Sequence, residues 1–286
     1  MKFSWLVSGV IACLMLQAET RAAELKVMSF NIRYGAANDG DNSWPHRREM
    51  VASTIQSYGP DLLGTQETLP FQAEFLREHL PDYKYVGWSR DDKPDGEQCG
   101  IFYRTERFRE LESGQFWLSE TPETRNSVSW DSSLPRVATW VLLEDSQSDK
   151  TPLLFVNTHF DHRGKEARRQ SAKLLREWIE ARPEQQRVVL TGDFNTGENT
   201  APWVTLAESS RLVDTYQACP PKEEPGGPGT FHGFRGNAGP ARIDWILCSP
   251  TLTVNESTID RTNEQGRYPS DHFPVTARLT SSAKGK

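Results

Sequence analysis

The chain has 286 residues, of which 36% are hydrophobic and 25% are charged. This composition, with 10% aromatic residues, excludes a disordered chain and is typical of a soluble globular protein. The formal net charge of -6 argues against a protein that wraps long duplex nucleic acid, because such a protein needs Lys and Arg to neutralise phosphates.

The N-terminus has the pattern of an export signal. Lys2 precedes an apolar run over residues 3–16, and the small residues Ala22 and Ala23 follow. The run is short for a membrane-spanning helix, and no later stretch fits one. We therefore expect residues 1–23 to be a signal peptide, residues 24–286 to form a single domain, and the protein to be exported to the periplasm or the extracellular space.

Three cysteines remain after such a cleavage: Cys99, Cys219 and Cys248. They allow at most one disulfide within a monomer, so the domain is not a scaffold built on disulfides. The spacing leaves open whether any pair forms.

The first half of the chain combines apolar strands with amphipathic helices. Ser43 is placed to cap the first helix, and Pro45 lies in its first turn. The patterns predict strands at 25–31, 61–67, 83–88, 99–104, 115–118 and 136–143, helices at 44–55 and 71–80, and a surface loop at 119–135.

The second half continues this mixture. The patterns predict strands at 153–159, 187–192, 241–248, 252–259 and 271–279, helices at 165–182 and 201–209, and a loop at 220–229. Strands arrive singly between helices in places and in runs elsewhere. This order favours one α/β domain with two sheets packed face to face and helices outside them.

The stretch Arg187-Val-Val-Leu-Thr-Gly-Asp-Phe-Asn-Thr196 is the most informative one. A buried strand ends at Gly192, and side chains two residues apart in an extended chain point the same way. Asp193 and Asn195 therefore face one spot, while Phe194 turns toward the packing. Such a pair suits catalysis or metal binding, although Asp and Asn also cap helices.

Polar residues with chemical capacity end several other apolar strands. They are Asn31, Glu67, His159, Asp244, and Asp271 with His272. A carboxylate among apolar neighbours must be paired, hydrogen-bonded or bound to metal. Each residue alone could be a satisfied core group or a strand-end cap, but their recurrence predicts one shared site.

The segments that carry these residues resemble a known family when they are taken in order. They are Phe30-Asn-Ile-Arg33, Thr65-Gln-Glu67, Asn157-Thr-His159, Gly192-Asp-Phe-Asn195, Ile243-Asp-Trp245 and Ser270-Asp-His272. Together they resemble the endonuclease/exonuclease/phosphatase family, over about residues 25–280. The resemblance implies a four-layer α/β sandwich, with two packed mixed β-sheets flanked by helices.

The resemblance also implies a metal site. Glu67 would be the main Mg²⁺ ligand, with Asn31 and Asp271 nearby. A hard cation with carboxylate ligands and water suits Mg²⁺ or Mn²⁺ rather than zinc. The resemblance leaves open whether one or two metal ions act.

The remaining roles that the resemblance implies concern water and phosphate. Asp193 would orient and deprotonate the attacking water, and Asn195 would position the water or the phosphate. His272, held by Asp244, would contact the phosphoryl oxygens. His159 would stabilise the transition state or assist the leaving oxygen. The expected activity is that of an exported, metal-dependent phosphohydrolase.

Basic residues near the motifs are candidates for contacting the substrate phosphate. They are Arg33, Arg47, Arg48, Arg163, Arg168, His232 and Arg242. The alternative for each is a solvated surface charge. Arg33 stands where abasic-site endonucleases of the family carry an acid, so the resemblance is closer to secreted DNase I-like enzymes and DNA repair is disfavoured.

The expected partner is a phosphate ester, either a nucleic acid or a small phosphorylated molecule, acted on by a monomer. One alternative is a binding protein that keeps the fold without chemistry. A second is a two-zinc hydrolase, because His159-Phe-Asp-His162 partly matches the metallo-β-lactamase pattern H-x-H-x-D-H. Asn157 occupies the place of its first His, and no later His-bearing loop completes the pattern.

Overall fold

The computed structural model describes residues 23–148, 151–208, 211–223, 226–237 and 239–281. The predicted signal peptide, residues 1–23, therefore lies outside the described residues except for its last one. No helix in the described ranges has the length and apolarity that a membrane crossing requires.

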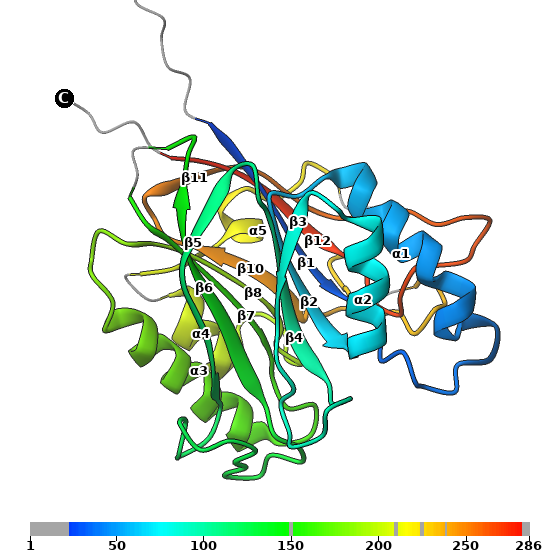
Figure 1. The fold of residues 1–286 in the computed structure, drawn as a ribbon, viewed down its shortest axis with the longest axis horizontal. Coiled ribbons are helices and arrows are strands. Elements are labelled where there is room, and N and C mark those ends of the chain that lie inside the picture. Colours follow the sequence, from blue (N-terminus) through cyan, green and yellow to red (C-terminus); the bar gives the residue numbers. More distant parts are fainter. Residues whose placement is uncertain (1–22, 149–150, 209–210, 224–225, 238, 282–286) are drawn as a thin grey trace, which may run out of the picture.

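Two six-stranded mixed sheets form the centre of the molecule (Figure 1). The first contains β1 (Glu24–Asn31), β2 (Leu62–Thr68), β3 (Tyr83–Val86), β4 (Gln98–Arg104), β11 (Leu252–Ile259) and β12 (Val275–Ser281), in the order β11-β12-β1-β2-β4-β3. The second contains β5 (Phe108–Trp117), β6 (Val137–Asp145), β7 (Leu153–His159), β8 (Arg187–Asp193), β9 (Val213–Asp214) and β10 (Asp244–Cys248), in the order β5-β6-β7-β8-β10-β9. The pairs β1–β2 and β7–β8 are parallel, and the other pairs are antiparallel.

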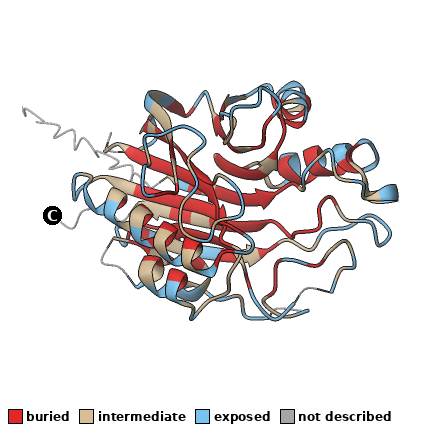
Figure 2. Ribbon diagram, turned by 90° about the horizontal axis from the view of Figure 1, so that it is seen from below, coloured by how far each residue is buried: buried red, intermediate tan, exposed pale blue. Residues whose placement is uncertain are grey.

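Helices cover the outer faces of both sheets. The first sheet carries α1 (Trp44–Tyr58) and α2 (Pro70–His79), and the second carries α3 (Lys165–Glu180) and α4 (Ala201–Ala207). Two short elements complete the set: the 3-10 turn η1 (Gly40–Asn42) and α5 (Thr215–Ala218). Figure 2 shows buried strands between helices whose outer faces are exposed. The predicted four-layer sandwich is confirmed.

The alternation of side chains along β1 builds two cores at once. Val27 packs between the sheets, whereas its neighbour Met28 and then Phe30 pack under the helices of the first sheet. This follows from the two-residue period of a strand. On the other side, α3 buries Ala172, Leu175 and Ile179, which are spaced three and four positions apart, against the second sheet.

A polar clamp joins the two sheets beside the site. The side chain of Asn157 on β7 donates to the carbonyls of Thr65 and Gly100, each at 2.8 Å, and accepts from Gln66 at 2.6 Å. Asn157 is fully buried, and these bonds satisfy its amide. The clamp fixes the relative position of the strands whose ends carry the site.

Several predicted boundaries differ from the structure. The strand predicted at 115–118 is part of the longer β5, an edge strand. The first half of β5 has mostly polar, part-exposed residues, so its sequence lacks the apolar pattern by which a strand is predicted. The strands predicted to begin at 241 and 271 begin at Asp244 and Val275. At the start of β10, the hydroxyl of Thr230 accepts hydrogen bonds from the backbone N–H groups of Ile243 and Asp244. These two groups therefore bond to a side chain rather than to a neighbouring strand. The short β9 and α5 had no distinct pattern, and the side chain of Ser43 makes no cap bond.

The cysteines Cys99, Cys219 and Cys248 are all free, and Cys99 and Cys248 are buried. Burial raises the pKa of both buried thiols to about 12, so they behave as apolar core groups.

Candidate active site

The register of three neighbouring strands assembles the centre of the site. Asp193, at the end of β8, pairs with His159 on the parallel strand β7 and with Asp244 on the antiparallel strand β10. These three predicted residues therefore lie side by side at one edge of the second sheet. They are all buried, with exposed fractions of 1% for Asp193, 4% for His159 and 1% for Asp244.

The first sheet brings Asn31 to the same spot. Its Nδ2 donates to Asp193 Oδ2 at 3.0 Å and to Glu67 Oε1 at 3.1 Å. Its Oδ1 accepts the backbone N–H of Arg33 at 2.9 Å. The amide thus presents a donor to both carboxylates and orients them, and its role as a metal ligand stays a prediction.

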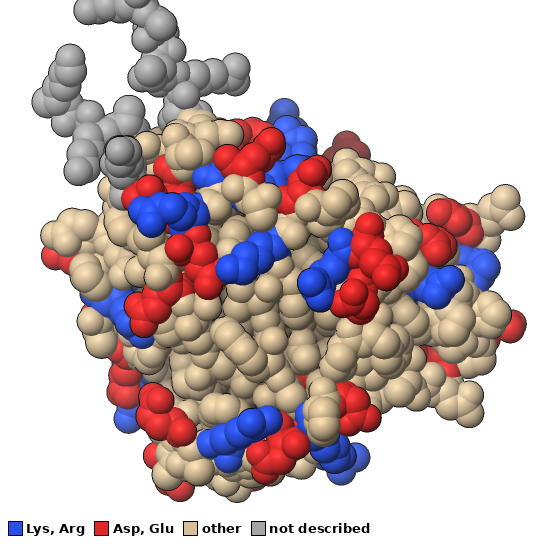
Figure 3. Space-filling view, in the orientation of Figure 1, with Lys and Arg blue, Asp and Glu red and all other residues tan. Residues whose placement is uncertain are grey.

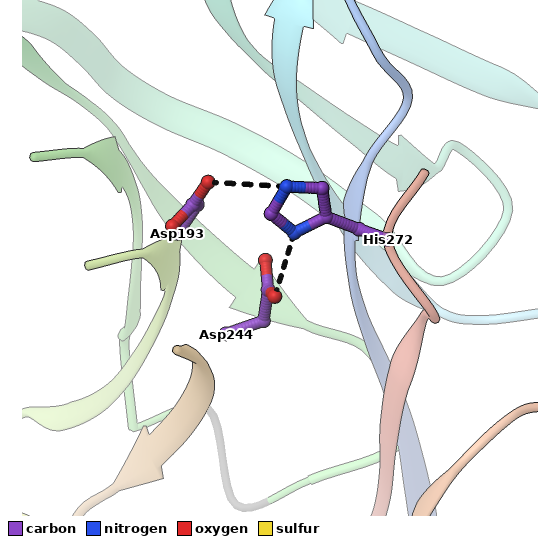
Figure 4. A group of neighbouring side chains, drawn as sticks. All are labelled: Asp193, Asp244 and His272. Atoms are coloured by element: carbon purple, nitrogen blue, oxygen red, sulfur yellow. Dashed lines mark hydrogen bonds and ion pairs between the residues drawn. The ribbon is translucent and has the colours of Figure 1, made fainter. Parts of the chain in front are cut away.

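Asp244 and His272 form a buried pair (Figure 4). Asp244 Oδ2 and His272 Nδ1 are 2.9 Å apart, and the other ring nitrogen of His272 lies 3.8 Å from Asp193 Oδ2. Burial lowers the pKa of His272, but the carboxylates of Asp244 and Asp193 outweigh it, and the pKa stands well above its usual value. The raised pKa favours the imidazolium form of His272 between the two carboxylates.

Asp193 is held as an acceptor. Its Oδ1 accepts the backbone N–H of Asn195 at 2.9 Å, so the two residues do face one spot as predicted. Burial, followed by the adjacent charge of Asp244, raises the pKa of Asp193. A carboxylate whose pKa is raised toward the working pH is a more effective general base.

His159 contacts both Asp193 and Asn195. Its Nε2 lies 2.9 Å from Asn195 Nδ2 and 3.4 Å from Asp193 Oδ2. Burial, with the nearby charge of Arg136, lowers the pKa of His159 to about 3, so the ring is neutral at pH 7. A neutral imidazole that receives the Asn195 amide at Nε2 carries its proton on Nδ1, which faces Glu97 Oε1 at 3.5 Å.

Glu67 and Asp271 form a second acidic group in the cleft. Arg33 spans them, with its guanidinium 4.0 Å from Glu67 Oε2 and 3.6 Å from Asp271 Oδ2. Burial raises the pKa of Asp271. For Glu67, burial is outweighed by His159 and its other neighbours, and the pKa is lowered.

The residues present fit a divalent cation. Four acids, Glu67, Asp193, Asp244 and Asp271, lie in or beside one cleft, and the buried Asp244 Oδ1 has no hydrogen-bond partner among the described residues. Oxygen donors without cysteine suit Mg²⁺ or Mn²⁺. Two sets could hold such an ion: Glu67 with Asp271, or the cluster of Asp193, Asp244 and His272, whose ligand atoms lie within 4.8 Å of one another.

Three site residues have left-handed backbones, which glycine adopts most readily and asparagine more often than the other residue types. The φ angles are 61° at Arg33, 60° at Glu67 and 50° at Asn195. An irregularity in the β2–β4 ladder between Thr65 and Thr68 surrounds Glu67. Such conformations are costly and persist where surrounding structure enforces them, which is common at functional sites.

These residues line a cleft of about 390 Å³. Its walls include Arg33, Glu67, His159, Asp193, Asn195, Asp271 and His272 from the predicted set. The volume is within the range of small-molecule sites. On the face seen in Figure 3, the acidic and basic side chains of the described residues are interspersed, and no continuous basic stripe crosses it.

Two predicted phosphate contacts are contradicted by position. Arg47 is 1% exposed, and its guanidinium donates to the carbonyls of Asn42, Ile32, Pro269 and Arg33 at 2.6–3.0 Å. Arg242 is fully buried and donates to Asp214 at 2.6 Å and to Glu198 at 3.0 Å. Both arginines stabilise the fold around the site.

The other basic candidates also lie off the cleft walls. His232 is buried and stacks on Phe273 with ring centroids 3.9 Å apart. Arg163 and Arg48 are exposed, and Arg168 donates to the carbonyl of Asp161. Of the seven basic candidates named from the sequence as phosphate contacts beside the motifs, Arg33 alone lines the cleft.

The two-zinc alternative does not fit the arrangement. Asp161 accepts from Ser133 and from the backbone N–H groups of Arg163 and Gly164, so it braces its own loop. His162 Nδ1 contacts Arg136 at 3.0 Å. The His159-Phe-Asp-His162 segment is thus occupied by protein contacts.

The cleft also contains residues that the sequence patterns missed: Arg90, Glu97, Arg136 and His162. His162 had been noted only as a flanking residue or zinc ligand. Arg136 precedes β6 and Glu97 precedes β4, and both strands run antiparallel to a strand that ends at the site. The start of such a strand lies at the same edge, so this antiparallel pairing is the signal that could have identified them.

Comparisons with known proteins agree with this geometry. The model of the Endonuclease/Exonuclease/phosphatase family matches residues 28–272. A family protein from Bacteroides thetaiotaomicron superposes with a TM-score of 0.86 at 34% identity, covering 93% of this chain and 98% of its own. A mannosyl-6-phosphatase from the same organism gives 0.81 at 35% identity, covering 90% and 99%.

A relative found by sequence is an uncharacterized protein of Acanthamoeba polyphaga mimivirus. It is 28% identical over 185 residues, which are 61% of this chain and 68% of the viral protein. The family model, which matches residues 28–272, includes every strand-end residue of the site. The chain therefore belongs to the endonuclease/exonuclease/phosphatase family.

Proposed function

We propose that the protein is a metal-dependent phosphomonoesterase that acts on a small phosphorylated molecule. The observation that carries this proposal is that Asp193, whose pKa is raised, lies 3.8 Å from the imidazole of His272 and shares one cleft with the acidic pair of Glu67 and Asp271. That arrangement provides a base, a cation for phosphoryl oxygens and oxygen ligands for a metal. The cleft volume and the 35% identity to a mannosyl-6-phosphatase support a small substrate.

In this proposal Glu67 and Asp271 hold Mg²⁺ or Mn²⁺, and the other cluster performs the proton chemistry. The close contact of His272 with Asp244 and the raised pKa of the imidazole disfavour this histidine as a ligand. The bound cation would withdraw charge from the phosphoryl oxygens. Asp193 would accept a proton from the water that attacks phosphorus, while Asn31 and the Asn195 N–H hold its carboxylate in place.

His272 and Arg33 would bind the phosphoryl oxygens, since both present positive charge to the cleft. His159 is neutral in the free protein. An approaching phosphate dianion would raise its pKa, so that His159 would take up a proton from solvent and pass it to the leaving oxygen as the bond to phosphorus breaks.

The test is phosphate release from a panel of substrates with Mg²⁺ and with EDTA. We expect hexose 6-phosphates and p-nitrophenyl phosphate to be cleaved faster than bis-p-nitrophenyl phosphate or a short oligonucleotide, and EDTA to abolish turnover. Cleavage of diesters alone would instead indicate a nuclease. Binding of substrates without turnover of any of them would indicate the inactive binding protein.

We also propose that the protein is exported, on the basis of the apolar run over residues 3–16 behind Lys2. Fractionation of the native host with an antibody against the domain tests this. A full-length chain confined to the cytosol would contradict it.

A further inference from the structure

One wall of the cleft is not used by the proposed chemistry. It is formed by Arg90, Glu97, Arg136 and His162. None of these side chains belongs to the water-activating or acidic groups described above. The wall therefore raises the question of what part of the substrate it meets.

The contact between Arg136 and His162 fixes a hydrogen-bond donor. Arg136 Nη2 lies 3.0 Å from His162 Nδ1. A guanidinium can only donate, so Nδ1 accepts and the ring proton lies on Nε2. Partial burial and the charge of Arg136 also lower the pKa of His162, which keeps this tautomer neutral. No described residue makes a hydrogen bond to Nε2 of this exposed ring, so its N–H is free to donate to a ligand in the cleft.

The charges on this wall are balanced. Arg90 Nη1 donates to Glu97 Oε1 at 2.6 Å. Arg136 lies 3.9 Å from Glu97 and 3.6 Å from Asp161. With Asp161, which lies behind the wall and outside the cleft lining, two arginines face two carboxylates, so the positive charge is balanced and little remains for a second phosphate. Fixed donors without net charge suit neutral hydroxyl groups.

An apolar surface lies in the same cleft. Phe231 is 48% exposed although it lines the site, and its ring meets that of His272 at 60° with centroids 5.1 Å apart. Leu134, which is 37% exposed, and Ile243 also line the cleft. A sugar ring has an apolar C–H face and a rim of hydroxyls, which matches an exposed aromatic ring combined with a few fixed donors.

We propose that His162, held in one tautomer by Arg136, and Phe231 bind the leaving group of the reaction, and that this group is an uncharged polyhydroxyl molecule such as a hexose. His162 Nε2–H donates to one of its hydroxyl oxygens, and Phe231 packs against its apolar face. This assignment rests on the proposed phosphomonoesterase function and names the class of its substrate. His162 is then a specificity-determining residue.

The test compares two substrates that share the phosphate but differ in the leaving group. In His162→Ala, kcat/KM for a hexose 6-phosphate should fall by roughly ten-fold, the effect of one lost hydrogen bond to substrate. The value for p-nitrophenyl phosphate, which has no hydroxyl groups, should stay within about two-fold. His162→Gln keeps a donor near Nε2 and should recover much of the loss. His46→Ala, an exposed histidine on α1 outside the cleft, is the matched control.

Equal losses for both substrates would show that His162 acts on the phosphate, and no loss for either would show that it binds nothing; both results overturn the proposal. If the wild type cleaves neither substrate, the proposed function fails separately. Titration of the free hexose by NMR then decides. Binding that the wild type shows and His162→Ala loses would support the wall as a hexose site, and absence of binding to the wild type would overturn it.

Discussion

The buried pair of Asp244 and His272 gives the sharpest mechanistic prediction. Asp244→Asn keeps the size of the side chain but removes the charge that holds His272 protonated. Burial alone lowers the pKa of His272, and the carboxylates of Asp244 and Asp193 raise it above its usual value. Without the first of these carboxylates, we expect the pKa of His272 to fall and the ring to lose its proton at a lower pH.

The size of the effect follows from the contact that is lost. A hydrogen bond between charged groups, here at 2.9 Å and fully buried, contributes about 1.5–3 kcal/mol. If that stabilisation serves the transition state, kcat/KM falls by roughly ten- to a hundred-fold. The alkaline limb of the pH profile should also move to lower pH, because activity is lost as His272 deprotonates.

The assay is kcat/KM for p-nitrophenyl phosphate across pH, together with the ¹⁵N shifts of His272. Asp214→Asn is the matched control, since Asp214 is also a buried acid but pairs with Arg242 and Trp203 outside the cleft. It should lower the melting temperature without moving the alkaline limb. An Asp244→Asn enzyme with an unchanged limb and rate would refute the assignment of His272 as an imidazolium.

Three further predictions concern Arg47, His232 and Glu67. Arg47→Ala should lower the free energy of unfolding in urea by about 3 kcal/mol or more, because it leaves buried carbonyls without donors. The control Arg48→Ala, at an exposed position, should change the free energy of unfolding by less than about 0.5 kcal/mol. Equal effects of the two substitutions would contradict this. Burial, then His272, lowers the pKa of His232 from 6.5 to about 4, so the unfolded chain binds more protons in that window and stability falls as the pH drops through it. His232→Gln should therefore lose less of its melting temperature between about pH 7 and about pH 5 than the wild type, and an equal loss would exclude this contribution. Mg²⁺ at about a hundred times its Kd should stabilise the wild type by about 2.7 kcal/mol and Glu67→Gln by much less, and equal stabilisation would exclude Glu67 as a ligand.

The sequence was sufficient to predict which residues gather at the candidate site because these residues end apolar strands. Asp193 and His159 follow runs that are buried on both faces, and the parallel ladder then aligns them in register. Asp244 had to find a partner among apolar neighbours, and His272 supplies it. The four-layer sandwich followed from the same strands and the helices between them.

The errors arise where the deciding contact comes from a distant part of the chain. Arg47 begins a helix and looked like a phosphate ligand, yet its acceptors include the carbonyl of Pro269, 222 residues away. Arg242 is likewise neutralised by Asp214, and no local pattern reveals that pairing. Glu97 and Arg136 were missed because they precede strands, and only the antiparallel pairing brings strand starts to the site.

The most direct test of the central claim is phosphate release by the wild type and by Asp193→Asn, with Mg²⁺ and at equal protein concentration. The variant keeps the size of the side chain, but it cannot accept a proton from water. Asp193 as the general base predicts a loss of kcat of about 10² to 10⁴, with the melting temperature retained. Equal kcat values for the two proteins would contradict the claim that Asp193 activates the attacking water.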